Sequence, residues 1–311
     1  MILITGATSF VGRVVVSRLA TERQEVRCLL RPSRREQRLT EGIPFSSISA
    51  SMSDLPALRT AMQNVTAIVH LTGEEDLDHG ETLRTHVDDT KNLITAAQDT
   101  GVRRFIYLSR LGADRASAYP LFCARGEAEA ATRESGLDYT ILQASITYGP
   151  EDLSTNMLVM LAKMSPFILP IPNTGMSRFQ PLWVVDLATC ILATLDRHDL
   201  IGQTVPLGGP EHFTIEQLVT QVLRAAGMRR RIVRLPMPLA RTAITLFDAL
   251  LPRNPVPLWW LDLLTMGSAT DLVSIPRHFD FEPARLAQCL GYLRDKRPWR
   301  RDLIRFVLSY P

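Results

Sequence analysis

The sequence predicts an α/β fold with a doubly wound parallel sheet and a small C-terminal lobe. The chain begins with a short apolar run, residues 1–4, followed by two glycines and a helical pattern. Apolar runs and helical patterns then alternate, which is typical of a parallel sheet with helices on both faces. Beyond Pro150 this alternation loosens and prolines cluster. We therefore expect a Rossmann-type domain over residues 1–150 and a smaller lobe, not an independent domain, over 151–311.

The individual elements are predicted from the spacing of apolar residues, which is three to four in a helix. Strands are expected at 1–4, 25–30, 67–71, 104–109 and 139–142. Helices are expected directly after Gly12 and at 54–64, 81–99, 124–135 and 215–226. Because ligands of such sheets bind beyond the carboxyl ends of the strands, the segments that follow these strands are the candidates for a site.

The composition limits the classes of function. With 311 residues, of which 46% are hydrophobic, the chain can bury a large core. The net charge of +3 gives no reason to expect a nucleic-acid partner. The four cysteines form no C-x-x-C pair and the six histidines show no ligand spacing, so no metal site is predicted.

The sequence also bears on location. No apolar run approaches the roughly 18 residues that a membrane-spanning helix needs. The first residues form a strand pattern and do not resemble a secretion signal. We expect a cytoplasmic protein, with peripheral attachment to a membrane as an alternative.

The turn after the first strand carries the strongest functional signal. It reads Gly6-x-x-Ser9-x-x-Gly12, between a buried strand and a helix. Strand, glycine turn and helix together direct backbone N–H groups and a helix N-terminus at a pyrophosphate, so a dinucleotide site is predicted. Its expected phosphate-binding residues are Gly6, Thr8, Ser9, Phe10, Val11 and Gly12. Ser9 occupies a position where glycine allows close approach, but its hydroxyl can reach a phosphate oxygen.

Several segments in order resemble the atypical and extended branch of the short-chain dehydrogenase/reductase superfamily. The resemblance is greatest to NAD(P)-dependent epimerase/dehydratase-like proteins and to the group of the nucleotide-binding accessory subunit of respiratory complex I. It runs along nearly the whole chain and implies a Rossmann-type sheet with a C-terminal substrate lobe. The segments that carry it are Thr5–Thr8, His70–Gly73, Gly101–Ser109, Ser135–Leu142, Arg178–Pro181, Val185–Ala188 and Gly208–Glu211.

Arginines follow the second strand where NAD-selective relatives have an acidic residue. The guanidinium groups of Arg31 and Arg34 suit a 2′-phosphate by charge and geometry, so NADP(H) is the preferred cofactor and NAD(H) is possible. The alternative is a solvated basic loop. The resemblance places Ser51 where relatives often have an aspartate for the adenine. It also places Leu71, Thr72 and Gly73 at the nicotinamide-side ribose and Ser109 beneath the nicotinamide.

Catalysis in this superfamily uses a Tyr-x-x-x-Lys dyad, in which lysine lowers the pKa of the phenol and holds the ribose. Counting from Tyr119 puts Cys123 at the lysine position, whereas putting Arg125 there puts Leu121 at the tyrosine position. Neither register contains the dyad, so tyrosine-dependent hydride chemistry is predicted to be absent. The weak catalytic candidates are Tyr119, Arg125 and Ser109. Tyr119 acting from a shifted register, with Arg125 on the ribose, remains the alternative.

The C-terminal third has features of an interaction surface. An apolar helical stripe that includes Leu239, Leu246 and Phe247 is followed by Trp259 and Trp260. Near the end of the chain, basic residues surround Trp299: Arg294, Lys296, Arg297, Arg300, Arg301 and Arg305. This mixture suits a protein complex or an anionic membrane surface, whereas the simpler interpretation is a packed cover and a solvated tail.

Three functions are consistent with these patterns. The first is an NADP(H)-binding protein without the dyad that acts as a structural, assembly or redox-sensing partner of a larger complex. The second is an active NAD(P)-dependent reductase, epimerase or dehydratase acting on a small molecule. The third is a sensor of the nucleotide ratio that binds a regulator.

Overall fold

The computed structural model describes residues 1–32, 45–71, 83–165, 167–173, 175, 177–250 and 258–294. Contacts divide the chain into two units. Unit 1 consists of Met1–Ala144, Val184–Leu207 and Ser274–Phe281. Unit 2 consists of Ser145–Trp183, Gly208–Val273 and Glu282–Pro311. The sequence predicts a continuous division near residue 150, whereas each of these units is assembled from separate stretches of chain.

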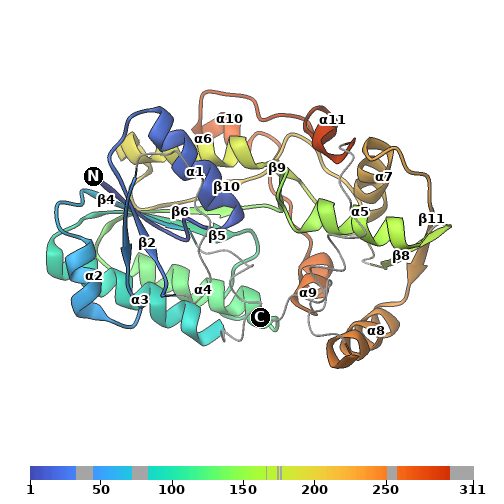
Figure 1. Ribbon diagram of the computed structural model, residues 1–311, viewed down its shortest axis with the longest axis horizontal. Coiled ribbons are helices and arrows are strands. Elements are labelled where there is room, and N and C mark those ends of the chain that lie inside the picture. Colours follow the sequence, from blue (N-terminus) through green and yellow to red (C-terminus); the bar gives the residue numbers. More distant parts are fainter. Residues whose placement is uncertain are drawn as a thin grey trace. The chain divides into compact units, whose positions relative to one another are not determined.

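Unit 1 is built on a sheet of seven parallel strands (Figure 1). Their spatial order is β10 (Gln203–Leu207), β6 (Asp138–Ala144), β5 (Arg104–Arg110), β4 (Ala67–Leu71), β1 (Ile2–Thr5), β2 (Val26–Leu30) and β3 (Ser46–Ser49). Because β1 is flanked by β2 and β4, the strand order reverses there, and ligands bind at such a point in open α/β sheets. The predicted doubly wound parallel sheet is confirmed.

Two strands of this sheet do not appear among the elements expected from the sequence, and both lie at its edges. β3 is mostly exposed and consists of three serines and an isoleucine. β10 contains Pro206, which lacks a backbone N–H. Edge strands tolerate polar residues and proline because only one side pairs, so an apolar pattern does not reveal them.

Helices cover both faces of the sheet. α1 (Phe10–Thr21) packs with α6 (Val184–Asp196) on one face (Figure 1). On the other face α3 (Leu83–Thr100) lies between α2 (Leu55–Ala61) and α4 (Pro120–Arg133). α4 begins earlier than expected because Pro120 occupies its first turn, where a backbone N–H has no intrahelical partner to lose. The short helices η2 (His198–Leu200) and α10 (Ser274–His278) complete unit 1.

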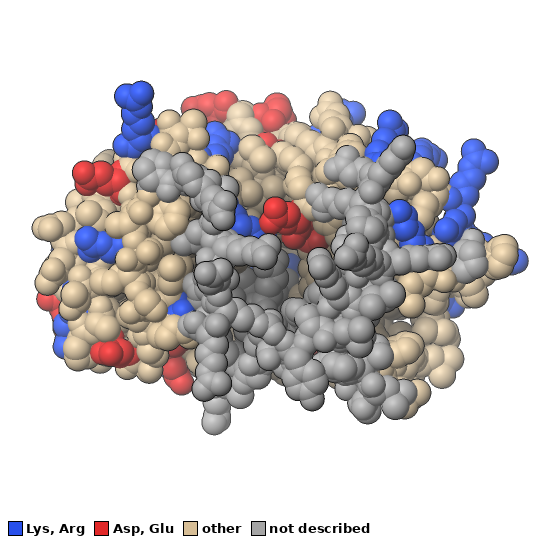
Figure 2. Space-filling view, in the orientation of Figure 1, with Lys and Arg blue, Asp and Glu red and all other residues tan. Residues whose placement is uncertain are grey.

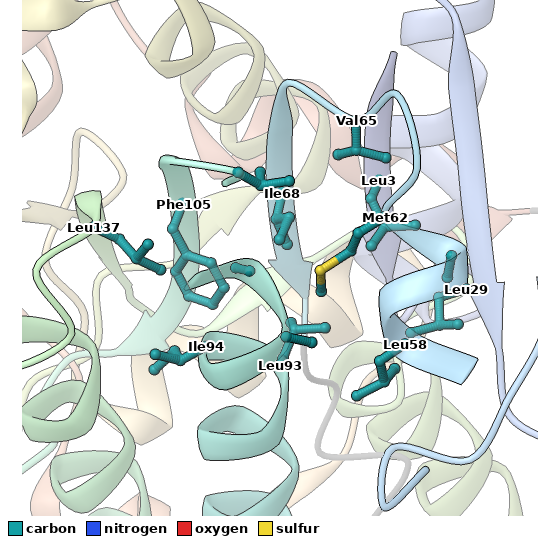
Figure 3. Packing of buried hydrophobic residues seen from close by; sticks show 14 of the residues in the cluster. Leu3, Leu29, Leu58, Met62, Val65, Ile68, Leu93, Ile94, Phe105 and Leu137 are labelled. Carbon is teal, nitrogen blue, oxygen red and sulfur yellow. The ribbon is translucent and has the colours of Figure 1, made fainter. Parts of the chain in front are cut away.

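The core between the sheet and α2 and α3 joins residues that are distant in sequence. Leu3, Ile68 and Phe105 project from three neighbouring strands and are fully buried (Figure 3). Leu58 of α2 and Leu93 of α3 pack against them. Burying each such side chain contributes about 1.5–3 kcal/mol, so this cluster fixes the strands whose ends carry the candidate site.

Unit 2 is formed by smaller elements. Its helices are α5 (Ser154–Met164), α7 (Ile215–Ala225), α8 (Met237–Leu250), α9 (Leu258–Met266), α11 (Leu286–Cys289) and η3 (Leu290–Arg294). Two parallel strand pairs accompany them: β7 (Thr147–Tyr148) with β9 (Leu182–Trp183), and β8 (Ile168–Pro172) with β11 (Arg231–Leu235). The helix expected at 215–226 is confirmed, and Thr214 begins it through a reciprocal capping box with Gln217.

Gln180 shows why one of the family-like segments is structural. Its side chain is fully buried, donates to the carbonyl of Gly209 at 2.6 Å and accepts from the N–H of Thr270 at 2.7 Å. It therefore ties together two loops of unit 2. Among the described residues, no helix is long and apolar enough to cross a membrane.

Candidate functional site

The β1–α1 turn has room only for glycine at two positions. Gly6 has φ +68°, and a Cβ atom on it would lie 1.7 Å from the carbonyl oxygen of Leu71. A Cβ atom on Gly12 would lie 2.1 Å from the carbonyl oxygen of Gly6. The glycines therefore let α1 pack directly against the turn, with its N-terminus beyond the carboxyl end of β1. This is the backbone geometry that a pyrophosphate requires.

Ser9 is the N-cap of α1, which explains the serine at the middle position. Its φ of −67° and ψ of 165° are accessible to any residue, so glycine is not needed for the turn. Its hydroxyl oxygen accepts from the N–H of Gly12 at 3.1 Å. Because the same hydroxyl still has a proton to donate, Ser9 can cap the helix and contact a phosphate oxygen together. Of the other expected phosphate contacts, Thr8 and Val11 are half-buried and Phe10 is buried at this turn.

Arg31 lies directly after β2, as expected, but its guanidinium is held by an acidic residue. The Nη2 of Arg31 lies 3.0 Å from the carboxylate of Asp89 on α3. The Asp89 side chain is only 8% exposed, whereas that of Arg31 is 35% exposed. The ion pair orients the guanidinium and offsets part of its charge, a feature that the sequence does not reveal. Arg34 lies outside the described residues.

The other expected ribose and adenine contacts are less complete. The exposed Ser51 precedes α2, and its hydroxyl lies 2.8 Å from that of Ser53. It offers a hydroxyl where relatives often have a carboxylate. Leu71 ends β4 and is buried. Thr72 and Gly73 lie outside the described residues.

A buried polar network runs from the turn toward α4, and no sequence pattern pointed to it. Nδ1 of His70 lies 2.6 Å from the hydroxyl of Thr5, the residue before Gly6. Nε2 of His70 lies 3.0 Å from the hydroxyl of Thr90, which itself donates to the carbonyl of His86. Because the Thr90 proton is used in that way, Nε2 of His70 donates and Nδ1 accepts from Thr5. Burial lowers the pKa of His70 to about 3, helped by Arg125 and Arg31, so the ring is neutral.

The network continues through Tyr107 to Arg125. The Tyr107 hydroxyl lies 3.1 Å from Nε2 of His86 and accepts from Nη1 of Arg125 at 3.5 Å. Burial, together with the charge of Arg125, lowers the pKa of His86 well below its usual value. Arg125 is only 4% exposed. It lies inside unit 1 beside Tyr107, which was not anticipated for a ribose-binding residue.

The start of α4 contains the residues at the family's dyad positions. Tyr119 precedes the helix, and the N–H of Cys123 donates to its carbonyl at 3.0 Å, so the two lie one turn apart. Cys123 donates its thiol toward the carbonyl of Arg115 at 3.3 Å. Arg125 is two residues further along, about 200° around the helix from Cys123. It is therefore not the residue one turn from Tyr119, and Cys123 occupies that place.

Ser109 is engaged by a carboxylate that the sequence did not single out. Its hydroxyl donates to Glu129 of α4 at 2.6 Å. The side-chain amide of Gln143 donates to the same carboxylate at 2.8 Å, and Arg133 forms an ion pair with it. Glu129 is 1% exposed, so these donors compensate its buried charge. The cluster joins α4 to β5 and β6, and within it the Ser109 hydroxyl is hydrogen-bonded to Glu129.

The structure describes only part of the predicted interaction surface in the C-terminal third. Trp259 and Trp260 are half-buried, and Trp260 packs against the core of unit 2. Leu239, Leu246 and Phe247 of α8 are exposed. Trp299 and the basic residues from Lys296 onward lie outside the described residues. Within the described ranges, no group of three or more His, Cys, Asp or Glu side chains could hold a metal ion.

A dinucleotide fits the geometry of the turn, because Gly6 and Gly12 let α1 pack directly against it and place the helix N-terminus beyond the end of β1. Gly6, Ser9 and the first turn of α1 would hold the pyrophosphate through backbone N–H groups and the Ser9 hydroxyl. The bound nicotinamide would supply or accept a hydride.

Comparison with known proteins agrees with this geometry. The model of the NAD(P)H-binding family matches residues 6–161, which include the turn, β4, β5 and α4. NADH dehydrogenase [ubiquinone] 1 alpha subcomplex subunit 9, mitochondrial, of Arabidopsis thaliana is 30% identical over 81% of this chain, which spans 64% of that relative. The photosystem II assembly factor Ycf39 of Guillardia theta is 24% identical over 94% of this chain and 93% of its own length.

Two further similarities concern reductases. The (4-alkanoyl-5-oxo-2,5-dihydrofuran-3-yl)methyl phosphate reductase of Streptomyces griseus is 29% identical over 78% of this chain and 80% of its own. An NADPH-dependent quinone oxidoreductase of Escherichia coli, solved with NADPH, has a TM-score of 0.74 at 21% identity over 95% of this chain and 100% of its own, which shows a shared fold. On the match to the family model, the glycine turn and the sheet order, this chain belongs to the NAD(P)H-binding family of atypical short-chain dehydrogenase/reductase-like proteins.

Proposed function

We propose that this protein binds NADP(H) and acts as a structural, assembly or redox-sensing partner of a larger complex, without tyrosine-dependent hydride chemistry. The observation that carries this proposal is the contrast between the two ends of the site. The β1–α1 turn keeps the tight glycine contacts that a pyrophosphate needs. The start of α4 has Cys123 where the dyad lysine would stand.

The chemistry of the residues near the dyad positions supports the absence of the usual proton relay. A thiol at position 123 has neither the positive charge nor the length with which the lysine of the dyad acts on the phenol and the ribose. Arg125 offers hydrogen-bond donors and no acceptor, and it is buried beside Tyr107. The hydroxyl of Ser109, the third candidate, donates a hydrogen bond to Glu129.

The preference for NADP(H) rests on Arg31. It directly follows β2, at the position that selects the ribose substituent in such folds, and its side chain is partly exposed. Asp89 orients the guanidinium, whose charge and planar geometry suit a phosphate. The partner role is supported by the names of two relatives, a subunit of NADH dehydrogenase and a photosystem II assembly factor. A cytoplasmic location, with peripheral attachment to a membrane, remains a prediction.

A reductase is the second candidate, and a specific observation favours it. One relative at 29% identity is named as a reductase of a phosphorylated furanone. Tyr119 is half-buried at the start of α4, where the family's acid stands.

The two candidates differ in what Tyr119 does. NADPH oxidation should be followed by absorbance with a panel of quinones and α,β-unsaturated carbonyl compounds, for the wild type and for Tyr119→Phe. We expect no difference between the two proteins at any acceptor. Loss of a measurable rate in Tyr119→Phe, with NADPH affinity retained, would establish the reductase and contradict our proposal.

A further inference from the structure

Unit 2 carries an unusual concentration of exposed apolar side chains. Among the described residues of the whole chain, the exposed large hydrophobics other than Val185 all belong to this unit. Four of them gather at the end of α5 and on the β8–β11 strand pair. They are Met164, Phe167, Ile168 and Val233, which are 61%, 80%, 48% and 39% exposed.

Strand register explains why Ile168 and Val233 share one face. Ile168 is paired with Arg231, and Pro170 with Val233. Paired residues of neighbouring strands project to the same side of a sheet, and so do residues two apart on one strand, so Ile168 and Val233 point outward together. Their neighbours Leu169 and Ile171 project to the other side and are buried in the core of unit 2. The N–H of Arg231 donates to the carbonyl of Phe167 at 3.0 Å, which holds the exposed ring beside the strand pair.

Arginines border this apolar face. From Gln217 to Leu235 the chain has five arginines and no acidic residue. Three of them line a surface cavity of about 590 Å³ between the end of α7 and β11, together with Met228 and Ile232. Figure 2 shows basic side chains gathered over α7 and β11.

Two of the five arginines have structural roles. Arg230 donates through Nε to the carbonyls of Ala162 and Ser165 at the end of α5, at 2.9 and 2.8 Å. Arg234 makes a two-pronged ion pair with Glu216 at 2.6 and 2.8 Å. Arg224, Arg229 and Arg231 are exposed, and within the described chain no acidic side chain pairs with them. The acidic group nearest in sequence, Glu216, is already neutralised.

We propose that this surface docks the protein on a bilayer that contains anionic phospholipids. We call it the β8–β11 patch: Met164, Phe167, Ile168, Val233, Arg224, Arg229 and Arg231. Phe167 and Ile168 enter the headgroup layer, and the arginines bind lipid phosphates. The cavity lined by Arg224 and Arg229 is large enough for a headgroup.

Two features favour a bilayer over an acidic protein. Phe167 is 80% exposed and Met164 is 61% exposed, and a bilayer interface accepts protruding apolar side chains without a matching pocket. Arg231 pairs with Ile168 and lies beside Phe167, so its charge can meet the phosphates of the same surface that receives Phe167. The proposal is independent of nucleotide binding, because every residue of the patch belongs to unit 2 and the glycine turn belongs to unit 1.

Flotation with vesicles tests this directly. The full-length protein should float with vesicles of phosphatidylcholine and phosphatidylglycerol at low salt, and not with phosphatidylcholine alone. The double variant Arg229→Gln/Arg231→Gln should lower the partition coefficient about 30-fold, since the loss of each basic residue near an anionic surface lowers it about fivefold. Phe167→Ser should lower it about tenfold.

Matched controls separate the patch from general charge and hydrophobicity. Arg23→Gln/Lys91→Gln removes two exposed charges from unit 1, and Val185→Ser removes an exposed apolar side chain from unit 1. Both controls should float as the wild type does. Circular dichroism spectra and NADPH titrations of all variants should match the wild type, which shows that folding and nucleotide binding are unaffected.

Three results would overturn the proposal. The wild type could fail to float with anionic vesicles, or it could float equally well with phosphatidylcholine alone. The patch variants could float as the wild type does. Failure with vesicles together with arginine-dependent binding to polyglutamate would instead identify an acidic protein as the partner.

Discussion

Ser9 offers a sharp test of how the glycine turn works. The structure identifies its hydroxyl as the N-cap of α1 and its backbone as ordinary extended chain. Serine-to-alanine changes at an N-cap cost about 1 kcal/mol, whereas serine to glycine costs a few tenths. We therefore expect Ser9→Ala to weaken the start of α1 and Ser9→Gly to leave it nearly unchanged.

The measurement must report on unit 1. All four tryptophans, Trp183, Trp259, Trp260 and Trp299, belong to unit 2, so fluorescence would follow the wrong part of the chain. Hydrogen exchange of a peptide covering residues 1–21 reports on β1 and α1. A loss of about 1 kcal/mol in local stability corresponds to roughly fivefold faster exchange, which we expect for Ser9→Ala.

Nucleotide titration of the same variants completes the test. If φ at position 9 needs no glycine, Ser9→Gly should leave the NADPH dissociation constant within about threefold of the wild type. A tenfold or greater gain in affinity with Ser9→Gly would show that serine obstructs the phosphate. Unchanged exchange in Ser9→Ala would refute the capping role.

Three further predictions follow from the site. Gly6→Ala should destabilise unit 1 and abolish NADPH binding, because its Cβ would collide with the Leu71 carbonyl. The control Gly101→Ala has a similar positive φ and no atom within 4 Å of its Cβ, so it should lose only about 1 kcal/mol of stability. Equal losses of stability in the two variants would contradict the close contact with Leu71. Arg31→Gln should lower the ratio of NADPH affinity to NADH affinity about 10- to 100-fold. Asp89→Asn should raise this ratio, because it removes the carboxylate that offsets the charge of Arg31. An unchanged affinity ratio in Arg31→Gln would show that Arg31 does not contact the nucleotide. Since the folded-state pKa of His70 lies at about 3, the unfolded chain binds its proton first as pH drops below about 6.5. His70 should therefore contribute about 1.4 kcal/mol per pH unit to the fall in stability measured by urea unfolding, in addition to the contribution of His86, whose pKa is also lowered. His70→Gln should reduce the slope by that amount, and an unchanged slope would contradict this assignment.

The fold of unit 1 was largely predictable because its central strands are buried on both faces. β1, β4 and β5 read as continuous apolar runs, and the helices between them have a regular apolar spacing. β3 and β10 were not predictable from that pattern, since edge strands bury less surface. The discontinuous composition of the units was also hidden, because β10 joins the sheet after a long excursion through unit 2.

The site was predictable in its backbone and not in its side chains. Gly6 and Gly12 were recognisable because their spacing reflects a steric requirement of the turn. The partners of Ser109, Arg31 and Arg125 come from elements that are distant in sequence, and no local spacing specifies them. His70 lies in a strand that otherwise reads as apolar, so its network with Thr5 is visible only in three dimensions.

The most direct test of the central claim is a calorimetric titration of the purified protein with NADPH, NADP⁺ and NADH, after any nucleotide it carries has been released and identified. We predict saturable binding of one nucleotide per chain, tighter for NADPH than for NADH, and no binding in Gly12→Ala. Absence of binding by any of the three nucleotides in the folded wild type would contradict the account, because the glycine turn would then be a structural element only.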